Sequence, residues 1–164
     1  MYDDDFVVRE LTRNYRNGKK ILKFGNDIIA KMRSFSASPV TAVRESMGSI
    51  RKIEAYEITR LIKQSKDYGN WAILCRSNQK ITQVMNTLER AGIPCITFRQ
   101  AQGGLGELKE KLHSDKVKVL TIHSAKGLEF DKVIVCDMYT RGEENLRVCY
   151  VAVTRARDEL YLCM

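Results

Sequence analysis

The sequence predicts a doubly wound α/β domain, in which helices cover both faces of a mostly parallel sheet. Segments with strand-like and helix-like apolar spacing alternate along the chain, and residues 71–75 and 133–136 are continuously apolar. Strands that are apolar on both faces are typical of parallel sheets buried between helices. The length of 164 residues, with 44% hydrophobic residues, suits one such domain with a substantial core.

The first half of the chain is expected to contain two strands and two helices. Residues 6–11 form a short strand-like run. A helix is then predicted to begin near Asn17, a favourable N-cap residue, and to end before a loop at 34–39. Its apolar face is formed by Ile21, Phe24, Ile28 and Met32. A short strand at 41–46 and a longer helix to about Lys66 follow. The apolar positions of this second helix are Ile50, Ile53, Ile58 and Leu61.

The second half alternates between strands and helices more regularly. A strand at 71–75 precedes a helix that Asn78 is predicted to cap and that Gly92 and Pro94 end. The remaining expected elements are a strand at 95–98, a glycine-rich turn at 100–106, a helix at 107–113, strands at 116–122 and 133–136, a helix at 143–156 and a strand at 159–164.

Charge and composition limit the class of protein. Lys and Arg number 28 against 20 Asp and Glu, a net charge of +8 that suits either a polyanionic partner such as nucleic acid or an ordinary basic domain. No run approaches the ~20 apolar residues that span a bilayer, so no membrane association is expected. The five cysteines are odd in number and widely spaced, and with two histidines they predict neither a disulfide framework nor a metal site. Together with an acidic start that is unlike a leader peptide, this indicates a reducing compartment such as the cytoplasm.

Two polar stretches are candidate binding loops, because ligands of doubly wound sheets bind beyond the carboxyl ends of the strands. Tyr15 and Arg16 place an aromatic ring beside a guanidinium, a pair that is also common at a solvated helix entry. Residues 121–130 combine hydroxyls, an imidazole, an ammonium group, a glycine and a carboxylate. These groups suit phosphate binding, and they also suit an ordinary polar turn.

A third stretch, residues 149–157, is predicted to be a helix end so apolar that it is mostly buried. Arg155 on such a helix needs an anionic partner. That partner is either a bound ligand or a carboxylate of the same domain, for instance Glu129 or Asp131.

These stretches resemble the motifs of a known family. Residues 14–16 (NYR), 121–130 (TIHSAKGLEF) and 150–157 (YVAVTRAR) resemble, in chain order, motifs IV, V and VI of the UvrD/Rep-like superfamily 1 DNA helicases. Residues 72–78 and the helix that follows resemble motif IVa. The resemblance implies a three-layer RecA-like fold, with residues 1–164 as the single C-terminal RecA-like domain of an ATP-dependent helicase or translocase of 3′→5′ polarity.

The resemblance also implies roles at a nucleotide site. Tyr15 would stack on the adenine ring, and Glu129 would line the nucleotide side of the cleft. Arg16 and Arg155 would be catalytic, because two guanidiniums placed on a transferring phosphoryl group stabilise its developing charge.

A second set of implied roles concerns single-stranded DNA. Thr121 and His123 would contact the DNA, and Arg76 and Asn78 would contact the DNA backbone.

Two features depart from the complete family pattern. The chain contains no Gly-x-x-x-x-Gly-Lys-Ser/Thr loop. Residues 133–137 imitate a magnesium-binding strand but follow the motif V stretch, so Asp137 is not expected to bind Mg²⁺. ATP with Mg²⁺ is therefore expected to bind between this chain and the N-terminal RecA-like domain of the same polypeptide. This chain alone is expected to hold no cofactor and to hydrolyse no ATP.

The second departure is a short connection. Only residues 95–115 separate the stretches that resemble motifs IVa and V, as in the compact branch of the family, which has no inserted accessory subdomain.

Two other functions remain open from the residues themselves. One is a non-enzymatic, basic nucleic-acid-binding α/β module, in which loss of Arg155 would have no cost for binding. The other is a flavodoxin-like regulatory domain that binds a nucleotide unaided.

Overall fold

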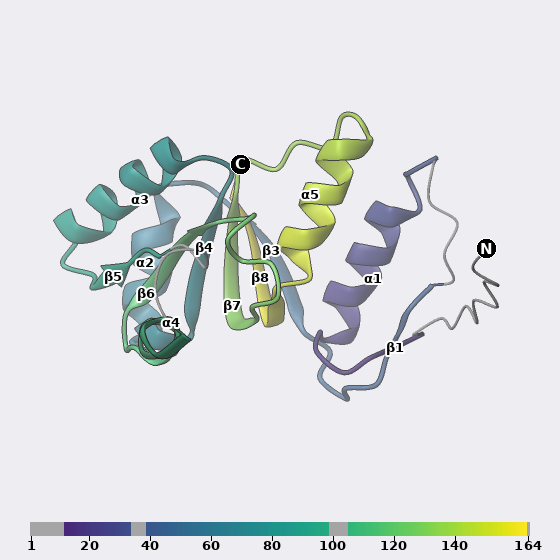
Figure 1. Cartoon of the computed structure of the whole chain (residues 1–164), viewed down its shortest axis with the longest axis horizontal. Helices are drawn as coiled ribbons and strands as arrows, with labels where there is room; N and C mark the ends of the chain where they lie inside the picture. Colours follow the sequence, from purple (N-terminus) through teal and green to yellow (C-terminus); the bar gives the residue numbers. More distant parts are fainter. Residues whose placement is uncertain (1–11, 34–38, 99–104, 164) are drawn as a thin grey trace, which may run out of the picture.

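The computed structural model describes residues 12–33, 39–98 and 105–163 (Figure 1). Its centre is a six-stranded sheet in the order β3-β8-β7-β4-β6-β5, with every neighbouring pair parallel. The strands are β3 (Ser49–Ile53), β4 (Trp71–Cys75), β5 (Cys95–Ile96), β6 (Val117–Thr121), β7 (Phe130–Cys136) and β8 (Ala156–Cys163). The helices are α1 (Lys19–Ile29), α2 (Glu57–Ser65), α3 (Asn78–Arg90), α4 (Leu105–His113), α5 (Glu143–Val153) and the 3-10 turn η1 (Tyr68–Asn70). Two further short strands, β1 (Arg13–Asn14) and β2 (Thr41–Ala42), pair in parallel with each other.

Helices cover both faces of the central sheet, as the sequence predicts. Figure 1 shows α1 and α5 side by side on one face and α2 and α3 on the opposite face. Along β4, Ala72 and Leu74 pack on the side of α1 and α5, whereas Ile73 and Cys75 pack on the side of α2 and α3. Every residue of β4 is consequently buried, which explains its continuously apolar sequence. The three-layer α/β fold class is confirmed.

The helix predicted to run to Lys66 is wrong in its first part. Residues 49–53 instead form the edge strand β3, which pairs with β8 from Ser49 opposite Glu159 to Ile53 opposite Cys163. Ile50 and Ile53 stand three residues apart, a spacing that is equally compatible with a helix. The strand forms because β8, more than a hundred residues later, offers its backbone groups for pairing, and α2 begins only at Glu57.

Three helix ends also differ from expectation. Helix α5 ends at Val153, and Ala156, predicted as helical, begins β8. Helix α1 begins at Lys19, with Gly18 as its N-cap residue, so Asn17 does not cap it. The cap of α3 is Ser77, whose hydroxyl accepts a hydrogen bond from the Lys80 amide, and Asn78 is the first helical residue.

The expected strand at 6–11 lies outside the described residues, as do most of the loops expected at 34–39 and 100–106. All five cysteines are free thiols, and four of them are buried. None of the described helices is long and apolar enough to cross a membrane.

Candidate functional site

The connection between β6 and β7 places the predicted site residues at both ends of the parallel strands. We call the side of the sheet where the strands end the carboxyl edge, and the side where they begin the amino edge. Because both strands point the same way, residues 122–129 must return from the carboxyl edge to the amino edge. Thr121 therefore lies at the carboxyl edge. Glu129 and Arg155, which immediately precede β7 and β8, lie at the amino edge. This corrects the expectation that the ligand-binding loops all follow the carboxyl ends of strands.

Arg16 and Glu129 form an ion pair at the amino edge, although 113 residues separate them. Their Nε and Oε2 atoms are 2.5 Å apart, and the two side chains are 34% and 45% exposed. The neighbouring Tyr15 is 66% exposed. The structure thus brings a guanidinium, a carboxylate and an accessible aromatic ring to one surface.

Arg155 lies in the turn between α5 and β8 rather than on the helix, and within the described residues its guanidinium donates to neutral acceptors. It donates to the carbonyl oxygens of Val151 at 3.0 Å and Leu128 at 3.2 Å, and to the Thr154 hydroxyl at 3.1 Å. Burial lowers the pKa of Arg155, and the positive charge of Arg16 lowers it further. The half-buried charge is hydrogen-bonded but not neutralised.

Neither of the two carboxylates named as internal partners of Arg155 forms a salt bridge with it. Glu129 is paired with Arg16, and Asp131 is paired with Arg157 at 3.4 Å. Two guanidiniums, those of Arg16 and Arg155, therefore lie within each other's electrostatic influence beside a single carboxylate. Such an arrangement attracts an additional anion.

Two asparagines, Asn14 and Asn17, hold the Tyr15–Arg16 segment against the turn that carries Arg155; we call them the asparagine clamp. The fully buried side chain of Asn17 donates to the carbonyl oxygens of Thr154 at 3.1 Å and Ala156 at 2.5 Å. Its Oδ1 accepts a hydrogen bond from Asn14 Nδ2 at 3.0 Å. Asn14 Oδ1 in turn accepts from the backbone amides of Arg16 and Asn17.

The clamp was missed in the sequence because Asn17 fits the local pattern of a helix cap. Only the fold shows that its partners are 137 and 139 residues away. The next residue, Gly18, packs so closely on Gly48 that an added Cβ would approach the Gly48 amide nitrogen to 2.6 Å. Glycine is therefore required at position 18 for this segment to lie against the turn.

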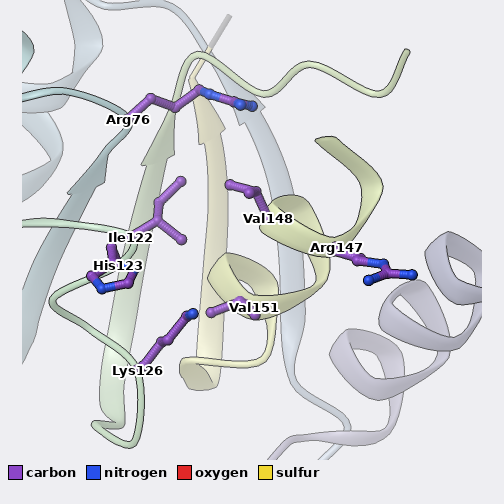
Figure 2. A pocket seen from close by; sticks show the side chains of 7 residues that line it. All are labelled: Arg76, Ile122, His123, Lys126, Arg147, Val148 and Val151. Carbon is purple, nitrogen blue, oxygen red and sulfur yellow. The ribbon is translucent and has the colours of Figure 1, made fainter. Parts of the chain in front are cut away.

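A pocket of about 230 Å³ lies between α5 and the loop after β6, and it extends from Arg76, which follows the carboxyl end of β4, to Val151 near the end of α5. It is lined by Arg76, Ile122, His123, Lys126, Arg147, Val148 and Val151, and we call it the basic pocket. Figure 2 shows Ile122, His123 and Lys126 on one side and Val148 and Val151 on the facing side, with Arg76 across the top. None of these seven residues is acidic. An apolar wall with cations around it suits a ligand that combines flat apolar groups with phosphates.

The structure brings together two of the four residues assigned to DNA contacts. Arg76 and His123 both line the basic pocket, whereas Thr121 and Asn78 do not. The hydroxyl of Thr121 bonds the hydroxyl of Ser124 at 2.9 Å and accepts from the Ser124 amide at 3.0 Å, so it shapes the loop. Asn78 is exposed at the first turn of α3.

Asp137, at the end of the strand that imitates a magnesium-binding element, pairs with Lys80 at 3.3 Å. Burial opposes the charge of Lys80, but the attraction of Asp137 outweighs it and raises the pKa of the lysine. Within the described ranges no cluster of three or more His, Cys, Asp or Glu side chains has the arrangement of a metal site.

Comparison with known proteins yields one family. The model of the UvrD-like helicase C-terminal domain matches residues 9–102 and 104–164. A protein of Acanthamoeba polyphaga mimivirus, named as an ATP-dependent DNA helicase, is 28% identical over 180 residues, which cover 94% of this chain and 26% of that protein. A probable DNA helicase of Mycoplasma pneumoniae is 25% identical over 192 residues, covering 97% of this chain and 33% of that protein. This chain thus spans about a quarter to a third of the length of these two relatives.

A solved structure has the same fold. It is the C-terminal domain of a possible DNA helicase from Lactobacillus plantarum, with a TM-score of 0.63 and 19% identity over 91% of this chain and 86% of that chain.

Proposed function

Because this chain belongs to the UvrD-like helicase C-terminal domain family, we propose that it supplies one side of an ATP site and part of the single-stranded DNA path of an ATP-dependent DNA helicase. The other side of the ATP site, with the phosphate-binding loop and the residues that hold Mg²⁺, belongs to the N-terminal RecA-like domain of the same polypeptide. The observation that carries the proposal is the cluster at the amino edge, in which the guanidiniums of Arg16 and Arg155 lie within each other's electrostatic influence and Glu129 pairs with Arg16.

In this function Arg16 and Arg155 contact the γ-phosphate. Arg155 already donates to three neutral oxygen atoms, which hold its guanidinium at a defined place without cancelling its charge. An arginine that is pre-positioned in this way stabilises charge that develops on a transferring phosphoryl group, because no reorganisation is needed during the reaction.

Arg16 has a different starting state, since Glu129 neutralises it. The triphosphate competes with Glu129 for Arg16, and Glu129 is then free to accept a hydrogen bond on the nucleotide side of the cleft. Tyr15, the residue before Arg16, has an exposed ring that stacks on the adenine.

The DNA side of the proposal rests on the basic pocket between α5 and the loop after β6. Arg76, His123 and Lys126 take phosphates of the single strand, and the loop 122–129 joins this pocket to Glu129 at the amino edge. Closure of the two domains on ATP moves the strand in steps, with 3′→5′ polarity.

The decisive experiment measures steady-state ATP hydrolysis by a protein that carries this chain together with its N-terminal helicase domain. Arg155→Ala and Arg16→Ala should each lower kcat, by roughly 10³-fold or more for a full arginine-finger role, with a smaller change in KM. Arg157→Ala is the matched control, because Arg157 belongs to the same segment but pairs with Asp131. Its kcat should stay within about twofold of the unsubstituted protein, since exposed ion pairs contribute little.

The rival function, a basic nucleic-acid-binding module without ATP chemistry, is favoured by the basic pocket alone. In that case Arg155→Ala leaves kcat unchanged while substitutions in the basic pocket still weaken DNA binding. That result would refute the ATP-site proposal.

A further inference from the structure

Tyr139 is an exposed aromatic residue that none of the assigned roles uses. It follows β7 at the carboxyl edge of the sheet, and 58% of its surface is accessible. The guanidinium carbon of Arg76 lies 5.3 Å from the centroid of its ring. Arg76 also lines the basic pocket, so one side chain both contacts the Tyr139 ring and lines that pocket.

Hydrogen bonds hold this pair of side chains in place. Arg76 Nη2 donates to Asn145 Oδ1 at 2.6 Å, and Asn145 Nδ2 donates to the carbonyl oxygen of Arg141 at 2.6 Å. The Cys149 thiol donates to the carbonyl oxygen of Tyr139 at 3.1 Å. Both the loop that carries the ring and the cation against it are therefore fixed in advance, and binding to the ring loses little conformational freedom.

Stability alone does not account for the position of Arg76. Its Nη1 atom is buried and has no hydrogen-bond partner among the described residues, which costs stability. The attraction between the guanidinium and the Tyr139 ring offsets part of that cost. The arrangement leaves Tyr139 more than half exposed next to a pocket lined by cations.

We propose that Tyr139 stacks on an unpaired base of single-stranded DNA, with the phosphates beside that base held in the basic pocket. An accessible aromatic ring beside a positively charged groove is the combination that binds single strands independently of sequence, because every base has a flat face. The inference rests on the DNA part of the proposed function and adds to it the residue that contacts a base.

The test measures binding of this chain to two fluorescently labelled oligonucleotides by fluorescence anisotropy at low salt. One is oligo(dT), and the other has the same length and charge but carries abasic sites. The unsubstituted chain should bind oligo(dT) more tightly than the abasic strand. Tyr139→Ala should lose most of this preference, with a fall in oligo(dT) affinity of about 5- to 150-fold, the usual range for one stacked base. The salt dependence of binding should not change, because the phosphate contacts remain.

Two control variants accompany Tyr139→Ala. Tyr139→Phe should bind both strands as the unsubstituted chain does, because phenylalanine retains the stacking face. Tyr56→Ala should also have no effect, although Tyr56 is 78% exposed, because it lies on the side of α2 and α3, away from the basic pocket.

The outcomes separate this inference from the proposed function. If Tyr139→Ala keeps the preference for bases while Lys126→Ala weakens binding to both strands, the stacking role is refuted and the DNA path stands. If the unsubstituted chain binds neither strand even at low salt, the DNA path and the stacking role are both refuted.

Discussion

Asn17→Ala should destabilise the chain far more than an ordinary asparagine substitution, because it removes the centre of the asparagine clamp. The side chain is fully buried and joins the carbonyl oxygens of Thr154 and Ala156 to the side chain of Asn14. Its removal leaves two buried carbonyls without their donor and leaves the Asn14 amide without its acceptor. The segment that carries Tyr15 and Arg16 is then released from the turn that carries Arg155.

The size of the effect follows from the number of hydrogen bonds lost. A buried polar group left unsatisfied costs about 1–3 kcal/mol, and water entering the small vacated space recovers part of that cost, so we expect a total of about 2–4 kcal/mol. At roughly 2–4 °C per kcal/mol for a domain of this size, the melting temperature should fall by about 4–16 °C.

Thermal unfolding followed by circular dichroism measures this change, and Asn26→Ala is the matched control. Asn26 lies on α1, and among the described residues its side chain makes one hydrogen bond, to the carbonyl oxygen of Val40 at 2.9 Å. Its loss should cost about 1 kcal/mol, or roughly 2–4 °C. If the two variants melt within about 2 °C of each other, the clamp does not carry the energy that we assign to it.

Asn17→Asp gives a second, pH-dependent readout of the same contact. A carboxylate at this position has no proton to donate to the two carbonyls, so burial and repulsion raise its folded-state pKa above the ordinary value of about 3.9. The folded state then binds a proton more strongly than the unfolded state, and stability falls as the pH rises through the folded pKa. Relative to the unsubstituted chain, the variant should be less destabilised at pH 4 than at pH 7.

Four further predictions concern the isolated chain. It should release no phosphate from ATP above background, because its sequence contains no phosphate-binding loop. In a plot of the logarithm of its affinity for single-stranded DNA against the logarithm of the salt concentration, the slope should be about −2 to −3. Each of three or four neutralised phosphates contributes about −0.7. A slope near zero would contradict the basic pocket as the DNA site. Arg155→Ala should lower the melting temperature by only about 2–8 °C, because it removes hydrogen bonds to neutral oxygens and leaves no carboxylate unpaired. A fall above about 10 °C would show that the arginine is mainly structural. Burial opposes the charge of Asp67, but hydrogen bonds from Ser65, Lys132 and Trp71 outweigh it and lower its pKa to about 2. The carboxylate therefore stabilises the fold above pH ~4 and loses this effect as the pH falls towards 2, so Asp67→Asn should flatten the acid side of the stability profile.

The sequence by itself determined the fold class and the family. Strand β4 and residues 133–136 of β7 are so continuously apolar that only a sheet covered on both faces accommodates them, and α3 has a clear helical period. The resemblance of residues 14–16, 121–130 and 150–157 to helicase motifs agrees with the match to the UvrD-like helicase C-terminal domain. These signals are local, because each depends on residues that are neighbours in the chain.

Tertiary structure alone decided what the site residues touch. Residues 49–53 have helix-like spacing and become a strand because β8 pairs with them. Arg155 was expected to need an anion, either a bound ligand or a carboxylate such as Glu129; in the fold it donates to the carbonyl of Leu128, and Glu129 pairs with Arg16. Asn17 looks like a helix cap until the fold brings the turn before β8 against it. Each of these contacts joins residues that are far apart in the sequence, and a local pattern contains no information about which distant backbone groups will be within hydrogen-bonding distance.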